Sequence, residues 1–247
     1  MKNASVQIST QQQQQLNASL LQGAIPIFQQ LGNYPDLANR LAGKPEIWTE
    51  VLKTLLPKRM IIPGNEVERW GKYYQDNFGI KHSFEGMEIP VPPAHPAWFV
   101  MMYANISGKC DPIVNVCRKH YKVWQFADGL DMSVIKHDRS GTYGLWVATS
   151  PDAEFGEENG QNLSSQDIWD RGLVTTTLPE RLILGDIFFL ENQQHLDQNK
   201  ITLCAGSRDS DGSVPSVDWS SSDGKVYVYD WSPRDASGSL RFRLAIC

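Results

Sequence analysis

Ser and Asp side chains dominate the C-terminal part of this sequence, from Leu203 to Cys247. Between Ser207 and Ser239 roughly half of the positions are Ser or Asp, and no Glu or Gln follows Gln198, although the earlier chain is rich in Gln. Short polar side chains form adaptable hydrogen bonds, and the tyrosines among them offer aromatic area at low entropic cost. The composition of this segment therefore predicts a recognition surface.

A second set of residues could bind a metal ion. The spacing Cys110-x6-Cys117-x2-His120 supplies three ligands, but it lacks the short C-x2-C pair of structural zinc sites, and no fourth ligand is evident. The other two cysteines, Cys204 and Cys247, are too scattered to build a disulfide scaffold. We therefore expect free, mostly buried thiols, and neither a metal nor a cofactor.

Length and composition limit the possible classes of protein. The 247 residues suffice for one large domain or two small ones, and 41% of them are hydrophobic. The net charge of -5 argues against nucleic acid as the main partner. No run of about 18 apolar residues occurs, and the N-terminus lacks the apolar core of a signal peptide. We therefore expect no membrane span and a cytoplasmic location, with the cell surface or a virion left open, as is the oligomeric state.

Residues 1–94 are expected to form a mostly helical N-terminal region. Apolar positions recur at helical spacing from Leu16, and further helices are predicted over Pro45–Leu56 and Glu66–Asn77. The Pro-rich stretch Ile89–Pro96 then marks the predicted domain boundary.

Residues 95–247 have the element order of an α+β domain. Strands are predicted at Trp98–Tyr103, Gly144–Ala148, Ile201–Cys204, Val214–Trp219, Lys225–Trp231 and Leu240–Ile246. Two helices are predicted between them, one over Gln166–Arg171 with Ser164 or Ser165 as its cap, and one that starts at Thr177. Because strands and helices do not alternate regularly, this order indicates an α+β domain and not a series of βα units.

Three motifs in this half resemble a known family. They are Leu203-Cys-Ala-Gly-Ser-Arg208, Val214-Pro-Ser-Val-Asp-Trp219 and Leu240-Arg-Phe-Arg-Leu-Ala245. With the two helical segments before them, they resemble the variable proteins of diversity-generating retroelements, whose C-terminal domain has a C-type lectin fold related to the formylglycine-generating enzymes. The resemblance covers residues 95–247 and implies a C-type lectin-like domain with a variable segment at about 207–241.

The resemblance also implies an origin for the unusual composition. In this family, template adenines are miscopied into the variable region, and the affected codons yield Asn, Ser, Asp, Tyr and similar residues but never Trp, Lys, Glu, Gln or Met. The implied variable, ligand-contacting residues are Asp209, Ser210, Ser213, Ser216, Asp218, Ser220, Ser221, Asp223, Tyr227, Tyr229, Asp230, Asp235 and Ser237. The expected constant framework residues are Gly206, Trp219, Trp231, Phe242 and Leu244.

The strand pattern is compatible with such variation. In Val226-Tyr-Val228 and Leu240-x-Phe-x-Leu244, alternate residues are apolar, so one strand face packs in the core while the other points outward. Together with the resemblance, which implies hypervariability, this pattern predicts a non-enzymatic binding protein whose unknown ligand is expected to be a protein.

Two other functions remain open from the residues. A formylglycine-generating-like oxidase would need a reactive cysteine pair, for which this half offers Cys204 and Cys247. A calcium-dependent sugar-binding lectin is suggested by Asp209-Ser-Asp-Gly212 with Asp218 and Asp223, although the EF-hand pattern ending in Glu is absent.

Overall fold

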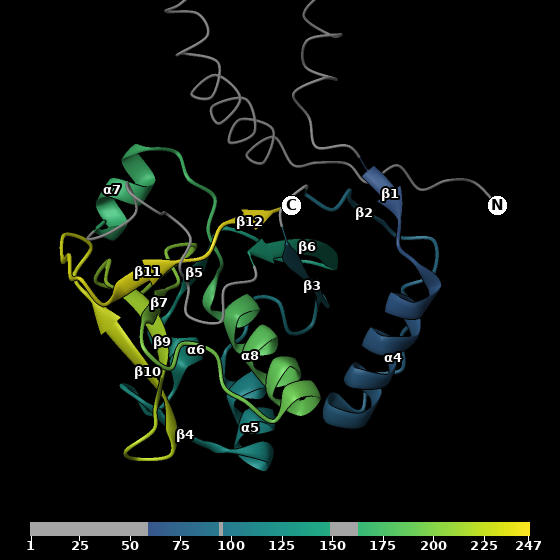
Figure 1. Cartoon of the computed structure of the whole chain (residues 1–247), viewed down its shortest axis with the longest axis horizontal. Helices are drawn as coiled ribbons and strands as arrows, with labels where there is room; N and C mark the ends of the chain where they lie inside the picture. Colours follow the sequence, from purple (N-terminus) through teal and green to yellow (C-terminus); the bar gives the residue numbers. More distant parts are fainter. Residues whose placement is uncertain (1–58, 94–95, 149–162) are drawn as a thin grey trace, which may run out of the picture. The chain divides into compact units, whose positions relative to one another are not determined.

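The structure is a computed structural model that describes residues 59–93, 96–148 and 163–247 (Figure 1). The chain divides into two compact units, Met1–Leu56 and Pro57–Cys247, and every described residue belongs to the second. The helices predicted from Leu16 and over Pro45–Leu56 lie outside the described residues. The division does not fall at the Pro-rich stretch Ile89–Pro96, where the sequence predicts a boundary.

The second unit has a mixed α and β architecture with several sheets. The described helices are α4 (Gly64–Phe78), α5 (Asp111–His120), α6 (Leu130–Ser133), α7 (Ser165–Asp170) and α8 (Leu178–Asn192). The described strands are β1 (Arg59–Ile61), β2 (Glu88–Pro90), β3 (Ala97–Met102), β4 (Lys122–Gln125), β5 (Lys136–His137), β6 (Tyr143–Ala148), β7 (Ile201–Leu203), β8 (Ser207–Arg208), β9 (Val214–Ser220), β10 (Lys225–Trp231), β11 (Leu240–Phe242) and β12 (Ala245–Ile246).

The largest described sheet has five strands in the order β11-β7-β9-β10-β4. Its centre is the antiparallel hairpin β9–β10, in which Tyr227 lies opposite Asp218 and Val228 opposite Val217. β4, which precedes β10 by about a hundred residues in sequence, pairs with it in parallel and completes the edge of the sheet. The hairpin is therefore held on both sides, by β7 and by β4.

The C-terminal strand predicted as one element is two strands in different sheets. β11 pairs in parallel with β7, whereas β12 pairs with β6 in a three-stranded sheet of order β12-β6-β3. Between them, Leu244 forms a bridge with Thr175. The last residues of the chain thus join the two sheets.

Helix α8 lies at the centre of the core, beside α5 and against β9 and β3 (Figure 1). Every residue from Leu178 to Ile187 is buried, as expected of a helix covered on all sides. Its first turn is closed by a capping box between Thr177 and Glu180, and that of α7 by one between Ser164 and Asp167, which confirms the predicted helix starts.

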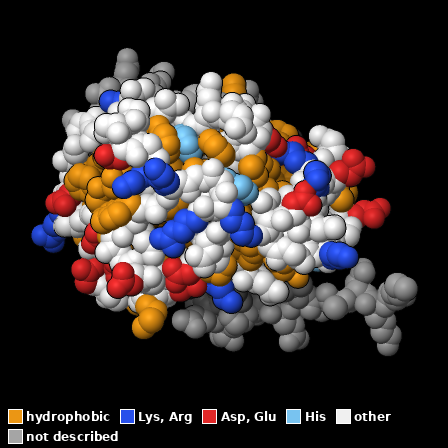
Figure 2. Space-filling view, turned by 90° about the horizontal axis from the view of Figure 1, so that it is seen from below, with side chains coloured by type: hydrophobic (Ala, Val, Ile, Leu, Met, Phe, Trp, Pro, Cys, Tyr) orange, Lys and Arg blue, Asp and Glu red, His pale blue; other side chains and the backbone are white. Residues whose placement is uncertain are grey.

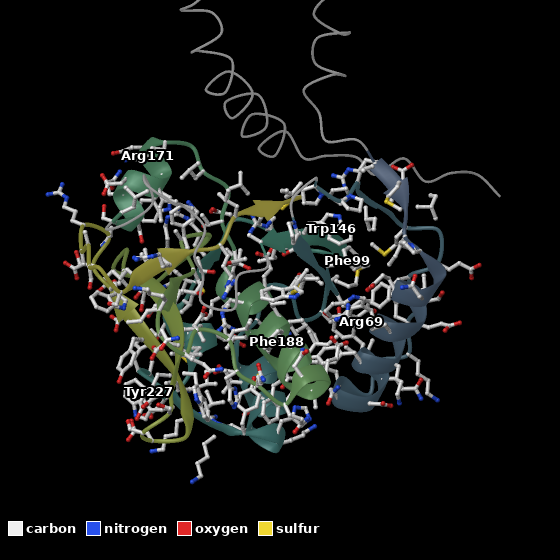
Figure 3. All side chains as sticks on the ribbon, viewed as in Figure 1. Arg69, Phe99, Trp146, Arg171, Phe188 and Tyr227 are labelled. Carbon is white, nitrogen blue, oxygen red and sulfur yellow. The ribbon has the colours of Figure 1, made fainter. Side chains whose placement is uncertain are left out.

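Helix α4 packs into the same core, which explains why the chain does not divide at the Pro-rich stretch. Trp70 and Tyr74 are fully buried, and the Tyr74 hydroxyl donates to the carbonyl oxygen of Met101 on β3 at 2.7 Å. Arg69 and Glu191 join α4 to α8 with an ion pair of 2.6 Å (Figure 3). α4 is therefore part of the unit that also contains the C-terminal strands.

None of the described helices combines the length and apolar character needed to cross a membrane.

Candidate ligand-binding face

The outward face of the β9–β10 hairpin brings several of the predicted contact residues together. Alternation along the strands places Asp218 and Ser220 of β9 on the same side as Tyr227 and Tyr229 of β10. Trp124 of β4 lies opposite Tyr227 in the parallel register and extends this side. We call these five side chains the hairpin face; Figure 3 shows Tyr227 on the part of β10 nearest the turn, on the side away from α8.

The aromatic side chains of the hairpin face form one exposed cluster. The rings of Tyr227 and Tyr229 stack with a centroid distance of 5.3 Å and an interplanar angle of 4°. The Trp124 ring lies 5.5 Å from Tyr227 and 4.8 Å from Tyr229. Trp124 and Tyr229 are 40% and 39% exposed. Exposed, clustered aromatic rings with polar atoms at their rims are typical anchors of a protein-binding surface.

Asp218, beside the tyrosines, has one buried carboxylate oxygen without a hydrogen bond from a described residue. Its Oδ1 atom is buried and forms no hydrogen bond within the described part of the chain. Burial, reinforced by the charge of Asp197 and partly offset by Arg181, raises the pKa of Asp218 to about 6. A buried carboxylate oxygen without a hydrogen bond carries a desolvation penalty in the folded chain.

The turn between the strands orders the end of the hairpin face. The Ser220 hydroxyl donates to Asp223 Oδ2 at 2.8 Å, and the Tyr227 hydroxyl donates to the same oxygen at 3.0 Å. The Ser220 hydrogen bond, followed by that of Tyr227, lowers the pKa of the Asp223 carboxyl. Asp223 is therefore charged at neutral pH and fixes the Tyr227 ring by its hydroxyl.

The thirteen predicted contact residues do not all lie in one place. Those at the turn end of the hairpin are Asp218, Ser220, Ser221, Asp223, Tyr227 and Tyr229. Those near the opposite end, in or beside the loops before β9 and after β10, are Asp209, Ser210, Ser213, Asp230, Asp235 and Ser237. All twelve are exposed or half-buried. The predicted contact residues therefore form two groups, and the group at the turn end contains the two tyrosines of the aromatic cluster.

The remaining predicted contact residue, Ser216, is fully buried and is not a surface residue. Its Oγ accepts a hydrogen bond of 3.0 Å from Trp231 Nε1. Strand alternation alone places Ser216 beside Asp218, but a second apolar cluster, which includes Ile168 of α7 and Val214, covers this part of the sheet. The outward face is thus open only at its turn end.

The predicted framework residues make contacts that explain why they would stay constant. A Cβ atom on Gly206 would lie 2.9 Å from the carbonyl oxygen of Thr175 and 3.1 Å from that of Thr176, so only glycine fits there. Trp219 stacks on His195 with a centroid distance of 3.6 Å. Phe242 is 4% exposed.

Trp231 and Leu244, the other two framework residues, pack at the edge of the second apolar cluster. Both are half-buried, and the indole nitrogen of Trp231 donates its hydrogen bond to Ser216. The framework residues therefore lie on the core side of the hairpin or under the covered part of its outward face.

Trp124 is the member of the hairpin face that the sequence prediction does not include. It belongs to β4, which follows α5, and neither element was predicted. In the structure the exposure of Lys122-Val-Trp-Gln125 alternates, but the residue types themselves, polar, apolar, apolar, polar, do not. Its partner β10 lies about a hundred residues away, so only the fold brings Trp124 to the tyrosines.

The cysteines occupy structural positions. All four are free, and Cys110, Cys117 and Cys204 are buried, which confirms the expectation of mostly buried thiols. The spacing that suggested metal ligands is helical: Cys110 caps α5, and Cys117 lies two turns later on its buried side. Burial raises the pKa of the Cys204 thiol far above its usual range, so it carries no thiolate at neutral pH.

Within the described residues, no three His, Cys, Asp or Glu side chains converge as a metal site. Asp211 instead caps its own loop by accepting from the backbone of Ser213 at 2.8 Å, and Asp223 is taken up by Ser220 and Tyr227. These carboxylates therefore have local hydrogen-bonding roles.

Comparison of the chain with protein-family models, curated proteins and solved structures gives no match.

Proposed function

We propose that this chain is a non-enzymatic binding protein with a C-type lectin-like C-terminal domain, and that its ligand contacts the hairpin face. The observation that carries the proposal is the exposed cluster of Trp124, Tyr227 and Tyr229. Aromatic anchors surrounded by short polar side chains suit a protein ligand. The lectin-like fold rests on the sequence resemblance, together with the mixed α and β architecture.

We further propose that mutagenic reverse transcription diversifies the contact residues. Support comes from the separation of roles within one hairpin. Val217, Val226 and Val228 are no more than 8% exposed, whereas twelve of the thirteen candidates have exposed surface. A domain with this separation can vary its contact residues without altering its core.

The test is at the level of the gene. We expect a reverse transcriptase gene nearby and a repeat of the C-terminal coding segment whose mismatches fall at template adenines. Those mismatches should alter the codons of exposed residues such as Tyr227 and Tyr229 and spare those of Val226 and Val228. A gene without such a repeat, or a repeat whose mismatches alter the valine codons equally, would contradict the proposed diversification.

A further inference from the structure

An open pocket of about 850 Å³ lies next to the hairpin face. Its lining comes from the C-terminal end of α5, from β4, from the turn of the β9–β10 hairpin and from α8 with the segment that follows it. Trp124 belongs both to this lining and to the hairpin face. We call it the basic pocket; Figure 2 views the molecule from this side and shows Lys and Arg side chains gathered near the middle of the view, with His side chains among them.

The charge of the basic pocket is opposite to that of the chain. Arg118, Lys119, Lys122 and Lys225 line it, and no carboxylate of the described residues does, although the whole sequence has a net charge of -5. Arg118, Lys122 and Lys225 form no salt bridge with any residue that the structure describes. Lys225 interacts electrostatically with Asp223 of the neighbouring turn. Cations around one hollow without a salt-bridge partner attract an anionic ligand.

One wall of the basic pocket is a rigid aromatic stack. The His195 ring lies between Trp219, at a centroid distance of 3.6 Å, and Phe189, at 4.6 Å, with interplanar angles of 13° and 20°. Tyr121 meets His195 edge-on at 4.9 Å. Burial, with a contribution from Arg181, lowers the pKa of His195 to about 4, so the stack is uncharged at neutral pH. This wall offers apolar area beside the cations.

His120 supplies an oriented hydrogen-bonding group to the same pocket. Its Nδ1 atom lies 2.8 Å from Oδ1 of the fully buried Asp186, whose other oxygen accepts from the Tyr73 hydroxyl at 2.8 Å. A carboxylate at Nδ1 fixes the ring and leaves Nε2 as the nitrogen for another partner. The buried Asp186 and Tyr73 thus hold the His120 ring in place, and no described residue forms a hydrogen bond with its Nε2 atom.

We propose that the basic pocket binds a short acidic segment of a partner protein, whose carboxylates contact Arg118, Lys122 and Lys225 while an apolar side chain packs on the Trp219–His195 wall. An open pocket at the upper end of the volume range for bound ligands suits a peptide that passes through it. The net charge of -5 repels a nucleic acid, which has one charge for each phosphate, more than a short peptide with a few carboxylates. None of the lining residues is among the thirteen candidates for diversification, so the inference does not depend on that proposal.

The experiment uses the full chain and a fluorescein-labelled peptide, Gly-Glu-Glu-Tyr-Glu-Glu-Gly, followed by fluorescence anisotropy. We expect saturable binding that weakens at least about tenfold in Lys122→Glu, because the substitution reverses a charge inside the pocket. The matched control is Lys81→Glu, which makes the same change at an exposed lysine outside the pocket and should alter Kd less than about twofold.

Four results would overturn the proposal. They are the absence of saturable binding, an equal loss of affinity in both lysine variants, equal binding of the peptide with Gln in place of Glu, and tighter binding of a labelled oligothymidylate than of the acidic peptide. The first result would mean that the pocket does not bind the peptide. The second and third would mean that binding does not depend on a specific charge contact in the pocket, and the fourth would mean that the pocket binds single-stranded nucleic acid.

Discussion

The two faces of the β9–β10 hairpin share one backbone but differ in what holds their side chains. On the inner face, Val217 and Val228 are fully buried and belong to the main core. On the outer face, the rings of Tyr227 and Tyr229 pack on each other and on Trp124, and the Tyr227 hydroxyl donates to Asp223. The inner face therefore contributes to the core, whereas the turn end of the outer face is available for the recognition role proposed above.

A buried charge cluster supports the inner face. Asp197 accepts hydrogen bonds from Arg181, Arg243 and Thr202, and all three are at most 3% exposed. The backbone carbonyl of Asp197 also accepts from the amide of Trp219 at 3.1 Å. The two faces should therefore respond differently to substitution.

The largest effect is expected at Asp197. Replacement by alanine leaves two buried guanidinium groups without their shared carboxylate, so Asp197→Ala should lose about 3–5 kcal/mol of unfolding free energy or fail to fold. The matched control is Asp223→Ala at the exposed turn, which should change stability by less than about 1 kcal/mol. Urea unfolding measures both, and comparable losses would remove the distinction between the faces.

A smaller difference in unfolding free energy is expected between substitutions at two adjacent residues of β10. Val228→Ala removes two buried methyl groups and should cost about 2 kcal/mol. Tyr229→Ser removes a ring that is 39% exposed and should cost less than about 1 kcal/mol, mainly from lost stacking with Tyr227. If Tyr229→Ser destabilises the chain more than Val228→Ala, the outer face is part of the core and the comparison is wrong.

The smallest expected effect is a change in the pH dependence of stability caused by Asp218 on the outer face. Burial raises the pKa of this carboxyl to about 6, above its ordinary value of 3.8. The folded chain therefore holds a proton between about pH 4 and 6 that the unfolded chain has released, so this group makes stability fall as pH rises through that window. Asp218→Asn should raise the Tm at pH 7 and leave it unchanged near pH 3.5. Parallel Tm profiles for the two proteins would contradict the assignment.

Much of the local structure could be predicted because its signals are local. The bounds of β10, Lys225–Trp231, follow from alternation, and the helix starts after Ser164 and Thr177 follow from capping residues. The site could be predicted only in part. Trp124 reaches the tyrosines through a pairing of distant strands, and Ser216 is covered by Trp231, so both outcomes depend on tertiary contacts.

The domain boundary illustrates the same limit. Proline residues at Ile89–Pro96 are a local sign of a change in the chain. Helix α4 precedes these prolines. Its packing against the rest of the unit depends on Asp186 and Glu191, which lie more than a hundred residues later in the sequence. Tyr73 and Arg69 of α4 bind these residues, and the helix joins the core for that reason.

The different roles of the two faces are tested most directly by the protease resistance of two displayed libraries. One randomises the six turn-end candidates, Asp218, Ser220, Ser221, Asp223, Tyr227 and Tyr229, with codons for Asn, Ser, Asp and Tyr. The other applies the same codons to six inner-face or framework positions, Val217, Trp219, Val226, Val228, Trp231 and Phe242. We expect most members of the first library to resist protease as the parent does, and almost none of the second. Equal loss of resistance in both libraries would contradict the claim that the inner-face and framework positions carry stability while the turn end of the outer face is free for recognition.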